Sequence, residues 1–176
     1  MEKNELRTLA LKKRKECPEK GDKSRIIALR VLDEIKDKQV IGLYVSKGDE
    51  VETHDLIQTC LSQGKTVVVP KVIKKTIIFV EIKSMDDLEP GVFGLLEPKS
   101  NDEYDLSKIE IMIIPMVGFD SLKHRIGYGK GYYDSVLDKI QCDFVGIAYA
   151  CQQVEDFICS VHDVPMTKIL TEYSEF

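Results

Sequence analysis

Two strand-like runs that are apolar on both faces limit the possible fold more than any other feature of this sequence. They are TVVV at residues 66–69 and IMII at 111–114. Strands of this kind occur mainly in parallel sheets whose two faces are both covered by helices. Strand-like and helix-like segments also alternate along the chain, as such a sheet requires. We therefore expect an α/β fold: a single three-layer α/β/α domain over residues 1–176, with a largely parallel central sheet.

Further strand-like runs recur along the whole chain. Pro70 is expected to close the strand that contains TVVV. The stretch 88–98 is punctuated by Pro and Gly and should be a loop with a short extended piece. The complete set of expected strands is 40–45, 66–70, 76–82, 109–115, 144–149 and 167–171.

Helical spacing of apolar residues predicts the segments between the strands. Gly21 is expected to break the chain between the first and the second helix. The core side of the second helix should carry Ile26, Leu29, Leu32 and Ile35. The expected helices are residues 2–16, Asp22 or Ser24 to about Lys36, Thr53 to Gly64, 132–140 and 151–158.

Charge and cysteine content exclude several classes of protein. The net charge of −5 makes the chain a poor candidate for nonspecific nucleic-acid binding. No run of about 18 apolar residues is present, so no membrane partner is expected. The five cysteines are an odd number without C-x-x-C spacing, which indicates reduced thiols in a cytoplasm rather than disulfides or a zinc site.

The first helix carries a basic stripe. Lys3, Arg7, Ala10 and Arg14 fall at helical spacing on one of its faces. Most stripes of this kind are solvated surfaces. The alternative is that the stripe binds an anionic partner.

A glycine-rich loop, GYGKGYYD at residues 127–134, lies between a buried strand and a helix. Free amides and the helix dipole favour an anion at such a junction. Lys123, Arg125 and Lys130 add cations that could hold phosphate oxygens. The loop matches neither a Walker A motif nor the dinucleotide fingerprint. It therefore indicates phosphate binding of another kind.

The aromatic and acidic residues of this loop leave two alternatives open. Tyr128, Tyr132 and Tyr133 could stack on a flat heterocycle, or the last two could pack under the sheet. Asp134 could bind Mg²⁺ beside the phosphates, or it could simply satisfy the start of the helix.

The segment GFDSLKHRIGYGKGYYDSVL, residues 118–137, resembles the signature of the 5-formyltetrahydrofolate cyclo-ligase family, whose members are also called 5,10-methenyltetrahydrofolate synthetases. The family's other landmarks occur in the right order over nearly the whole chain. One position departs from the pattern, because Lys123 stands where the family usually has glycine. The resemblance implies a fold of the sugar-phosphate isomerase and CoA-transferase type. The further landmarks are Lys3 with Arg7, and residues 44–53, 67–72, 91–98 and 162–172.

The resemblance implies an ATP- and Mg²⁺-dependent cyclisation of 5-formyltetrahydrofolate to 5,10-methenyltetrahydrofolate, with ADP and phosphate as the other products. It further implies a phosphorylated imidate intermediate and catalytic roles for Arg125 and Lys130. The implied ATP-binding residues are Lys3, Arg7, Arg125, Ile126, Gly127, Tyr128, Gly129, Lys130, Gly131, Tyr132 and Tyr133. The implied folate-binding residues are Val45, Glu50, Tyr128, Gly129, Lys130, Gly131 and Tyr132, and the implied metal ligands are Asp134 and Asp163.

Two other functions remain open from the residues alone. The chain could be a ligand-sensing regulatory domain of the same fold, or a phosphoryl-transfer enzyme that acts on another small substrate. Neither a nucleic acid nor a membrane is expected as partner. We expect a monomer whose substrate is 5-formyltetrahydrofolate, with or without a polyglutamate tail.

Overall fold

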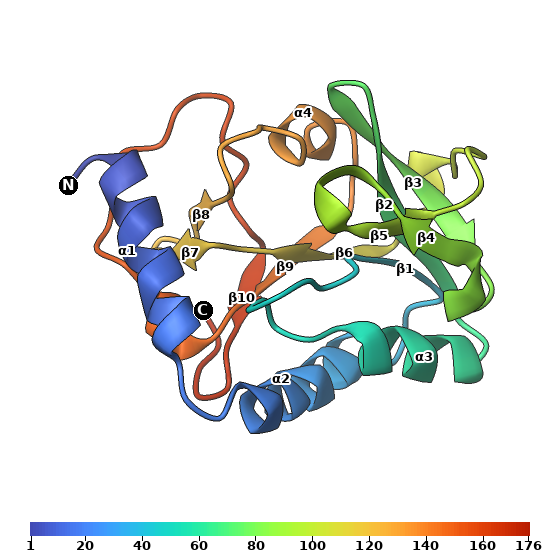
Figure 1. The fold of residues 1–176 in the computed structure, drawn as a ribbon, viewed down its shortest axis with the longest axis horizontal. Helices are drawn as coiled ribbons and strands as arrows, with labels where there is room; N and C mark the ends of the chain where they lie inside the picture. Colours follow the sequence, from blue (N-terminus) through green and yellow to red (C-terminus); the bar gives the residue numbers. More distant parts are fainter.

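A computed structural model describes all residues, 1–176, and its centre is a six-stranded sheet in the order β10-β9-β6-β1-β2-β3 (Figure 1). Neighbouring strands pair in parallel except at one edge, where β3 runs antiparallel to β2. The expected α/β class with a largely parallel sheet is confirmed. The strands are β1 (Val40–Leu43), β2 (Thr66–Ile73), β3 (Thr76–Ile82), β6 (Ile111–Pro115), β9 (Asp143–Ile147) and β10 (Lys168–Leu170).

Helices cover the two faces of the sheet unequally. One face packs against α2 (Lys20–Glu34) and α3 (His54–Ser62), which lie along the lower edge of Figure 1. The other face packs against the short α4 (Asp134–Leu137) and irregular segments. Because both faces are covered, the central strand β6 is buried along IMII, as its composition predicts.

The first helix, α1 (Lys3–Glu16), lies beside the sheet rather than on it (Figure 1). It packs against a small ladder of β7 (Gly118–Phe119) and β8 (Arg125–Ile126), which precedes the glycine loop. A second small ladder joins β4 (Leu88–Pro90) to β5 (Leu96–Pro98). Four 3-10 turns complete the chain: η1 (Met85–Asp87), η2 (Val92–Gly94), η3 (Leu106–Lys108) and η4 (Ala150–Gln152).

The expected start of the second helix was wrong, and its expected core side was right only for Leu32 and Ile35, which pack in the core. Helix α2 begins at Lys20 and contains Gly21, and the chain breaks earlier, at Glu19 with φ 56°. Its buried stripe includes Ile27 and Val31, whereas Ile26 is 44% and Leu29 is 68% exposed. The expected stripe steps by three residues, and each such step drifts about 60° around a helix. Ile26 and Ile35 therefore lie on opposite sides.

Two further boundaries differ from expectation. Strand β2 continues through Pro70, where it still pairs with β3. The proline is tolerated because β1 pairs with β2 only as far as Val68, so no hydrogen bond to β1 requires an N–H at residue 70. No helix forms over 151–158 apart from η4. Instead this segment bonds to β7, with the Val154 N–H donating to the Phe119 carbonyl at 2.9 Å. The helix expected over 132–140 is regular only in α4.

Candidate active site

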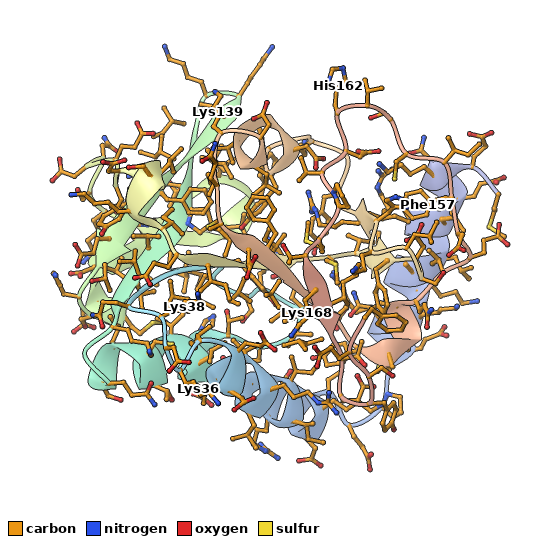
Figure 2. The ribbon with its side chains drawn as sticks, turned by 180° about the vertical axis from the view of Figure 1, so that it is seen from behind. Lys36, Lys38, Lys139, Phe157, His162 and Lys168 are labelled. Carbon is orange, nitrogen blue, oxygen red and sulfur yellow. The ribbon has the colours of Figure 1, made fainter.

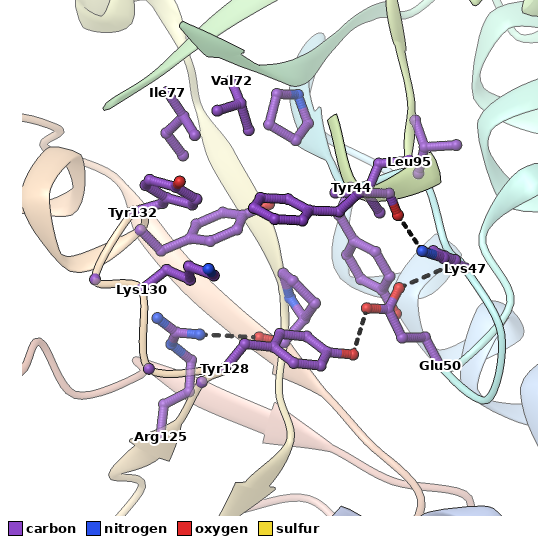
Figure 3. Close-up of a pocket in the computed structure, with 18 of the residues that line it drawn as sticks. Tyr44, Lys47, Glu50, Val72, Ile77, Leu95, Arg125, Tyr128, Lys130 and Tyr132 are labelled. Carbon is purple, nitrogen blue, oxygen red and sulfur yellow. Dashed lines mark hydrogen bonds between the residues drawn. The ribbon is translucent and has the colours of Figure 1, made fainter. Parts of the chain in front are cut away.

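A cavity of about 820 Å³ opens at the carboxyl ends of β1, β2 and β6 (Figure 3). Tyr44 and Val45 follow β1, Pro115 ends β6, and Val72 lies in the outer part of β2. Ligands of open α/β sheets bind at this edge, because the loops that follow parallel strands gather there. The cavity is therefore the candidate active site.

Nearly all the residues predicted from the sequence line this one cavity. The exceptions are Lys123, which lies in the turn before the loop, and Ile126, whose side chain is fully buried under α1 with Leu6 and Ala10. Ile126 thus anchors the loop and could reach a ligand only through its backbone. The predicted residues on the cavity wall are Lys3, Arg7, Val45, Glu50, Arg125, Gly127, Tyr128, Gly129, Lys130, Gly131, Tyr132, Tyr133, Asp134 and Asp163.

The basic stripe of α1 reaches the cavity from the far end of the sequence. The Arg7 Nε donates to the Gly127 carbonyl at 2.7 Å, and the Lys3 Nζ lies 2.8 Å from Asp163 Oδ2. Lys3 also lies 5.7 Å from the centre of the Phe157 ring, which Figure 2 shows beside α1. The helix therefore connects the glycine loop to the segment that carries Asp163.

The glycine loop takes a conformation that other residues adopt with difficulty. Gly129 has φ 91° and Gly131 has φ 70°, both in the left-handed region that favours glycine. Its glycines therefore let the backbone turn beside the cavity.

Asp120, fully buried, fixes the turn that leads into the loop. Its Oδ1 accepts the backbone N–H groups of Leu122 at 3.0 Å and His124 at 2.9 Å, and its Oδ2 lies 2.8 Å from His124 Nδ1. Within this turn Lys123 has φ 68°. The position where the resemblance implies a glycine is thus left-handed here, although it carries a lysine.

Arg125 lies at the cavity wall with only 7% of its side chain exposed. Its Nη1 donates to the Pro115 carbonyl at 3.3 Å, its Nη2 lies 3.7 Å from Asp134 Oδ1, and its Nε has no partner. The guanidinium also lies over the Tyr133 ring, at 5.4 Å from the ring centre. Burial lowers the pKa of Arg125, while the Asp134 carboxylate opposes that shift. A guanidinium nevertheless stays charged in proteins.

Glu50 lies on the opposite wall. Its Oε1 accepts a hydrogen bond from the Tyr128 hydroxyl at 2.8 Å and its Oε2 accepts one from the Lys47 backbone N–H at 3.0 Å (Figure 3). Burial raises the pKa of Glu50, and these hydrogen bonds oppose the shift. Burial also raises the pKa of Tyr128 to about 12, so its hydroxyl remains a donor at neutral pH. This wall of the cavity therefore offers a ligand a hydrogen-bond acceptor, the Glu50 carboxylate, whose position is fixed by two donors.

Asp134 and Asp163 both line the cavity, and each faces a cation. Burial alone would raise the pKa of Asp163, but hydrogen bonds from Lys3 and Ser160 outweigh it and lower the pKa overall. No group of three or more His, Cys, Asp and Glu side chains is placed to hold a metal ion. These two carboxylates fit Mg²⁺ only if a ligand with phosphate oxygens completes its coordination.

Comparison with known proteins shows to which family the chain belongs. A model described as the 5-formyltetrahydrofolate cyclo-ligase family matches residues 1–172. The chain belongs to the 5-formyltetrahydrofolate cyclo-ligase family. Membership makes it an enzyme, a ligase of folate metabolism, so the ligand-sensing alternative loses its basis.

Named relatives of the cyclo-ligase family match most of the chain. The 5-formyltetrahydrofolate cyclo-ligase of Haemophilus influenzae is 34% identical over 151 residues, which cover 81% of this chain and 80% of the relative. That of Mycoplasma pneumoniae is 33% identical and covers 98% of this chain and 99% of its own. The structure of 5,10-methenyltetrahydrofolate synthetase from Aquifex aeolicus matches with a TM-score of 0.88 at 30% identity, over 99% of this chain and 92% of that chain.

Sequence reasoning missed several residues of this cyclo-ligase cavity. Arg14 is buried at its wall, although its place in the basic stripe was a signal. Phe93 has no such signal: its ring, in the turn between β4 and β5, lies 4.6 Å from Lys130 Nζ. The apolar part of the wall comes from hairpins that local sequence does not bring together. Its members are Pro70, Val72, Ile77, Phe93, Leu95 and Leu96.

Proposed function

We propose that this chain closes the ring of 5-formyltetrahydrofolate to give 5,10-methenyltetrahydrofolate, with ATP and Mg²⁺ as co-substrate and metal and with ADP and phosphate as products. The observation that carries the proposal is one cavity with two chemically different ends. One end has the glycine loop with Arg7, Arg125 and Lys130, and the other has the half-buried acceptor Glu50 beside an apolar wall. The first end suits a triphosphate and the second suits a flat heterocycle with N–H donors.

The chemistry explains why a nucleotide is needed. A formamide oxygen is a feeble leaving group, so the proposed first step is its attack on the γ-phosphorus of ATP. An oxygen–phosphorus bond forms, the bond from the γ-phosphorus to the ADP oxygen breaks, and a phosphorylated imidate results. Nitrogen 10 of the folate then attacks the formyl carbon and loses its proton. The carbon–oxygen bond breaks as inorganic phosphate leaves with its electron pair and takes up that proton.

The residues of the chain would contribute position and charge rather than a covalent intermediate. The guanidinium of Arg125 is held against the Pro115 carbonyl and the Tyr133 ring, and so is preorganised. In this proposal Arg125 and Lys130 neutralise the charge that develops on the transferring phosphoryl group. Arg7 holds the loop through Gly127 and adds, with Lys3, positive charge near the phosphates.

Asp134 and Asp163 are the proposed magnesium ligands, and the bound ion would neutralise phosphate charge. Asp134 starts α4 directly after the loop, and Asp163 reaches the cavity from the segment before β10. Their present partners are the side chains of Arg125 and Lys3. Because these two cations are also proposed to face the phosphates, ATP would compete for them and free the carboxylates. Mg²⁺ should therefore bind together with the nucleotide and only weakly without it.

An omission assay tests the proposed function. The methenyl product absorbs in the near ultraviolet, where the formyl substrate does not. We expect absorbance to grow only when 5-formyltetrahydrofolate, ATP and Mg²⁺ are all present. Equal turnover without nucleotide would exclude a ligase and indicate another reaction at the site. Turnover of a different small amide with ATP, and none of the folate, would favour the other phosphoryl-transfer function.

A further inference from the structure

Arg14 is a buried cation at the cavity wall for which the proposed function gives no role. The residue is 6% exposed, lies in the last turn of α1, and pairs with no carboxylate. Its guanidinium makes one hydrogen bond, from Nη2 to the hydroxyl of Tyr128, at 2.8 Å. A charge buried in this way is unfavourable unless something in its surroundings compensates it.

The carboxylate of Glu50 compensates the charge of Arg14, and the Tyr128 hydroxyl connects the two. The Tyr128 hydroxyl that accepts from Arg14 donates its own hydrogen to Glu50 Oε1 at 2.8 Å. The direction of both bonds is fixed, because a guanidinium has only donors and a carboxylate only acceptors. The guanidinium also lies 5.6 Å from the centre of the Tyr128 ring. Arg14, Tyr128 and Glu50 therefore form a chain from cation to anion across three separate segments.

The other donors of Arg14 indicate how it acts. Its Nε and Nη1 are enclosed by protein and have no partner. A ligand in the cavity therefore does not reach them, and the guanidinium can act on a ligand only through Tyr128 and through its charge. An apolar side chain would fill the same space without unmatched donors, so packing alone does not account for an arginine here.

We propose that Arg14 is a positioning residue for the heterocycle end of the site. Through the Tyr128 hydroxyl it holds the Glu50 carboxylate in place as an acceptor for the N–H groups of a flat heterocyclic ligand. The identity of that ligand as a folate rests on the proposed function, whereas the chain of contacts does not.

The groups around Glu50 give the sign of the expected pH effect. Burial raises the pKa of Glu50, and the Lys47 N–H, the Tyr128 hydroxyl and the charges of Arg14 and Lys47 all act to lower it. Three tyrosine hydroxyls also lie near Glu50, those of Tyr44, Tyr133 and Tyr149, and they stay neutral because burial raises their pKa values. The neighbouring Asp49 pairs with Lys20 at 2.9 Å. Removing the Arg14 charge therefore raises the pKa of Glu50 further, so the carboxylate becomes protonated at a higher pH.

The direct test is an NMR titration of glutamate side-chain carboxyl carbons in the ligand-free protein. The Glu50 signal is assigned as the one missing from Glu50→Gln. We expect Arg14→Gln and Tyr128→Phe each to raise its midpoint. The matched control is Lys12→Gln, which removes an exposed cation from the same helix and should leave the midpoint unchanged. An unchanged midpoint in a folded Arg14→Gln protein overturns the proposal. If that variant does not fold, an unchanged midpoint in Tyr128→Phe overturns it instead.

A kinetic readout separates positioning from general damage to the fold. Arg14→Gln should raise KM for the formyl substrate by roughly tenfold, as expected on weakening a hydrogen bond to a charged group. KM for ATP should stay close to the wild-type value, and the acid limb of kcat/KM should move to higher pH. Equal losses for both substrates, with no movement of the acid limb, would make Arg14 merely structural. A shifted Glu50 midpoint in a protein that does not turn over the folate would sustain the chain of contacts and contradict the proposed function instead.

Discussion

At the scale of single residues, Lys123 shows a conflict between sequence and backbone. The turn held by Asp120 requires φ 68° at this position, where a side chain is strained. The sequence alone identified the position as unusual, because the family resemblance places a glycine there. It could not tell whether the lysine changes the turn, and the structure shows that the left-handed conformation is kept.

This strain leads to a stability prediction. Lys123→Gly should raise the free energy of unfolding by about 1 kcal/mol, since a left-handed residue other than glycine is strained by roughly that amount. The measurement is a denaturant titration that compares the variant with wild type. Lys123→Ala serves as the control, because it removes the charge and retains the strain. Equal stability of the glycine and alanine variants would show that this backbone is not strained.

The two candidate metal ligands can also be tested one residue at a time. Asp134→Asn and Asp163→Asn should each raise the Mg²⁺ concentration for half-maximal rate by roughly tenfold or more. The double variant should fall short of the product of the two effects, because both residues act on one ion. Asp33→Asn, on the exposed side of α2, is the control. Fully multiplicative effects would separate the two carboxylates into independent roles.

At the scale of elements, α1 lines the cavity although it lies far from the glycine loop in sequence. Periodicity predicted the helix, its apolar stripe and its basic stripe, but not that the basic stripe lies against the glycine loop. The packing depends on Gly118 of β7, where an added Cβ would lie 3.0 Å from the Cβ of Ala10 and 3.2 Å from the Gln152 carbonyl. That spacing leaves no room for a side chain between helix and ladder.

We therefore expect Gly118→Ala to lower the free energy of unfolding by about 1–3 kcal/mol, as overpacking does. It should also weaken ATP binding, since displacing α1 moves Arg7 away from the glycine loop. Gly21→Ala is a matched control: no atom lies within 4 Å of its added Cβ, so this variant should be as stable as wild type or more stable. Calorimetric titration with ATP and a thermal melt would check both effects. Unchanged ATP affinity in Gly118→Ala would show that the position of α1 does not govern the nucleotide end.

The errors at this scale have a common cause. Local pattern predicted the existence of most elements, because apolar runs and glycine turns depend on neighbouring residues. The end of β2 and the lost helix at 151–158 depend on partners instead: β1 stops short of Pro70, and β7 takes the hydrogen bonds of the later segment. These partners lie far away in sequence, so neighbouring residues alone do not predict where β2 ends or that residues 151–158 form no helix beyond η4.

At the scale of the whole molecule, the site is a meeting of distant segments at one edge of a parallel sheet. The alternation of strands and helices predicted the largely parallel sheet, and the glycine loop predicted the phosphate end that is proposed for the cavity. The apolar wall and the chain from Arg14 to Glu50 need the complete fold, because their members come from α1, the segment after β1, the β2–β3 hairpin and the β4–β5 turn. No helix is long and apolar enough to span a membrane, and all five cysteines are free.

Phosphorylation of the formyl oxygen by ATP would transfer that oxygen to the released phosphate, so an isotope label on the oxygen tests the proposed reaction. The substrate would carry ¹⁸O in its formyl group, and the phosphate released with unlabelled ATP would be analysed by mass spectrometry. A sample without protein controls for exchange of the label with water. If ATP phosphorylates the formyl oxygen, each phosphate formed with the methenyl product should contain one ¹⁸O atom. Unlabelled phosphate, with the ¹⁸O recovered in water, would contradict the proposed reaction.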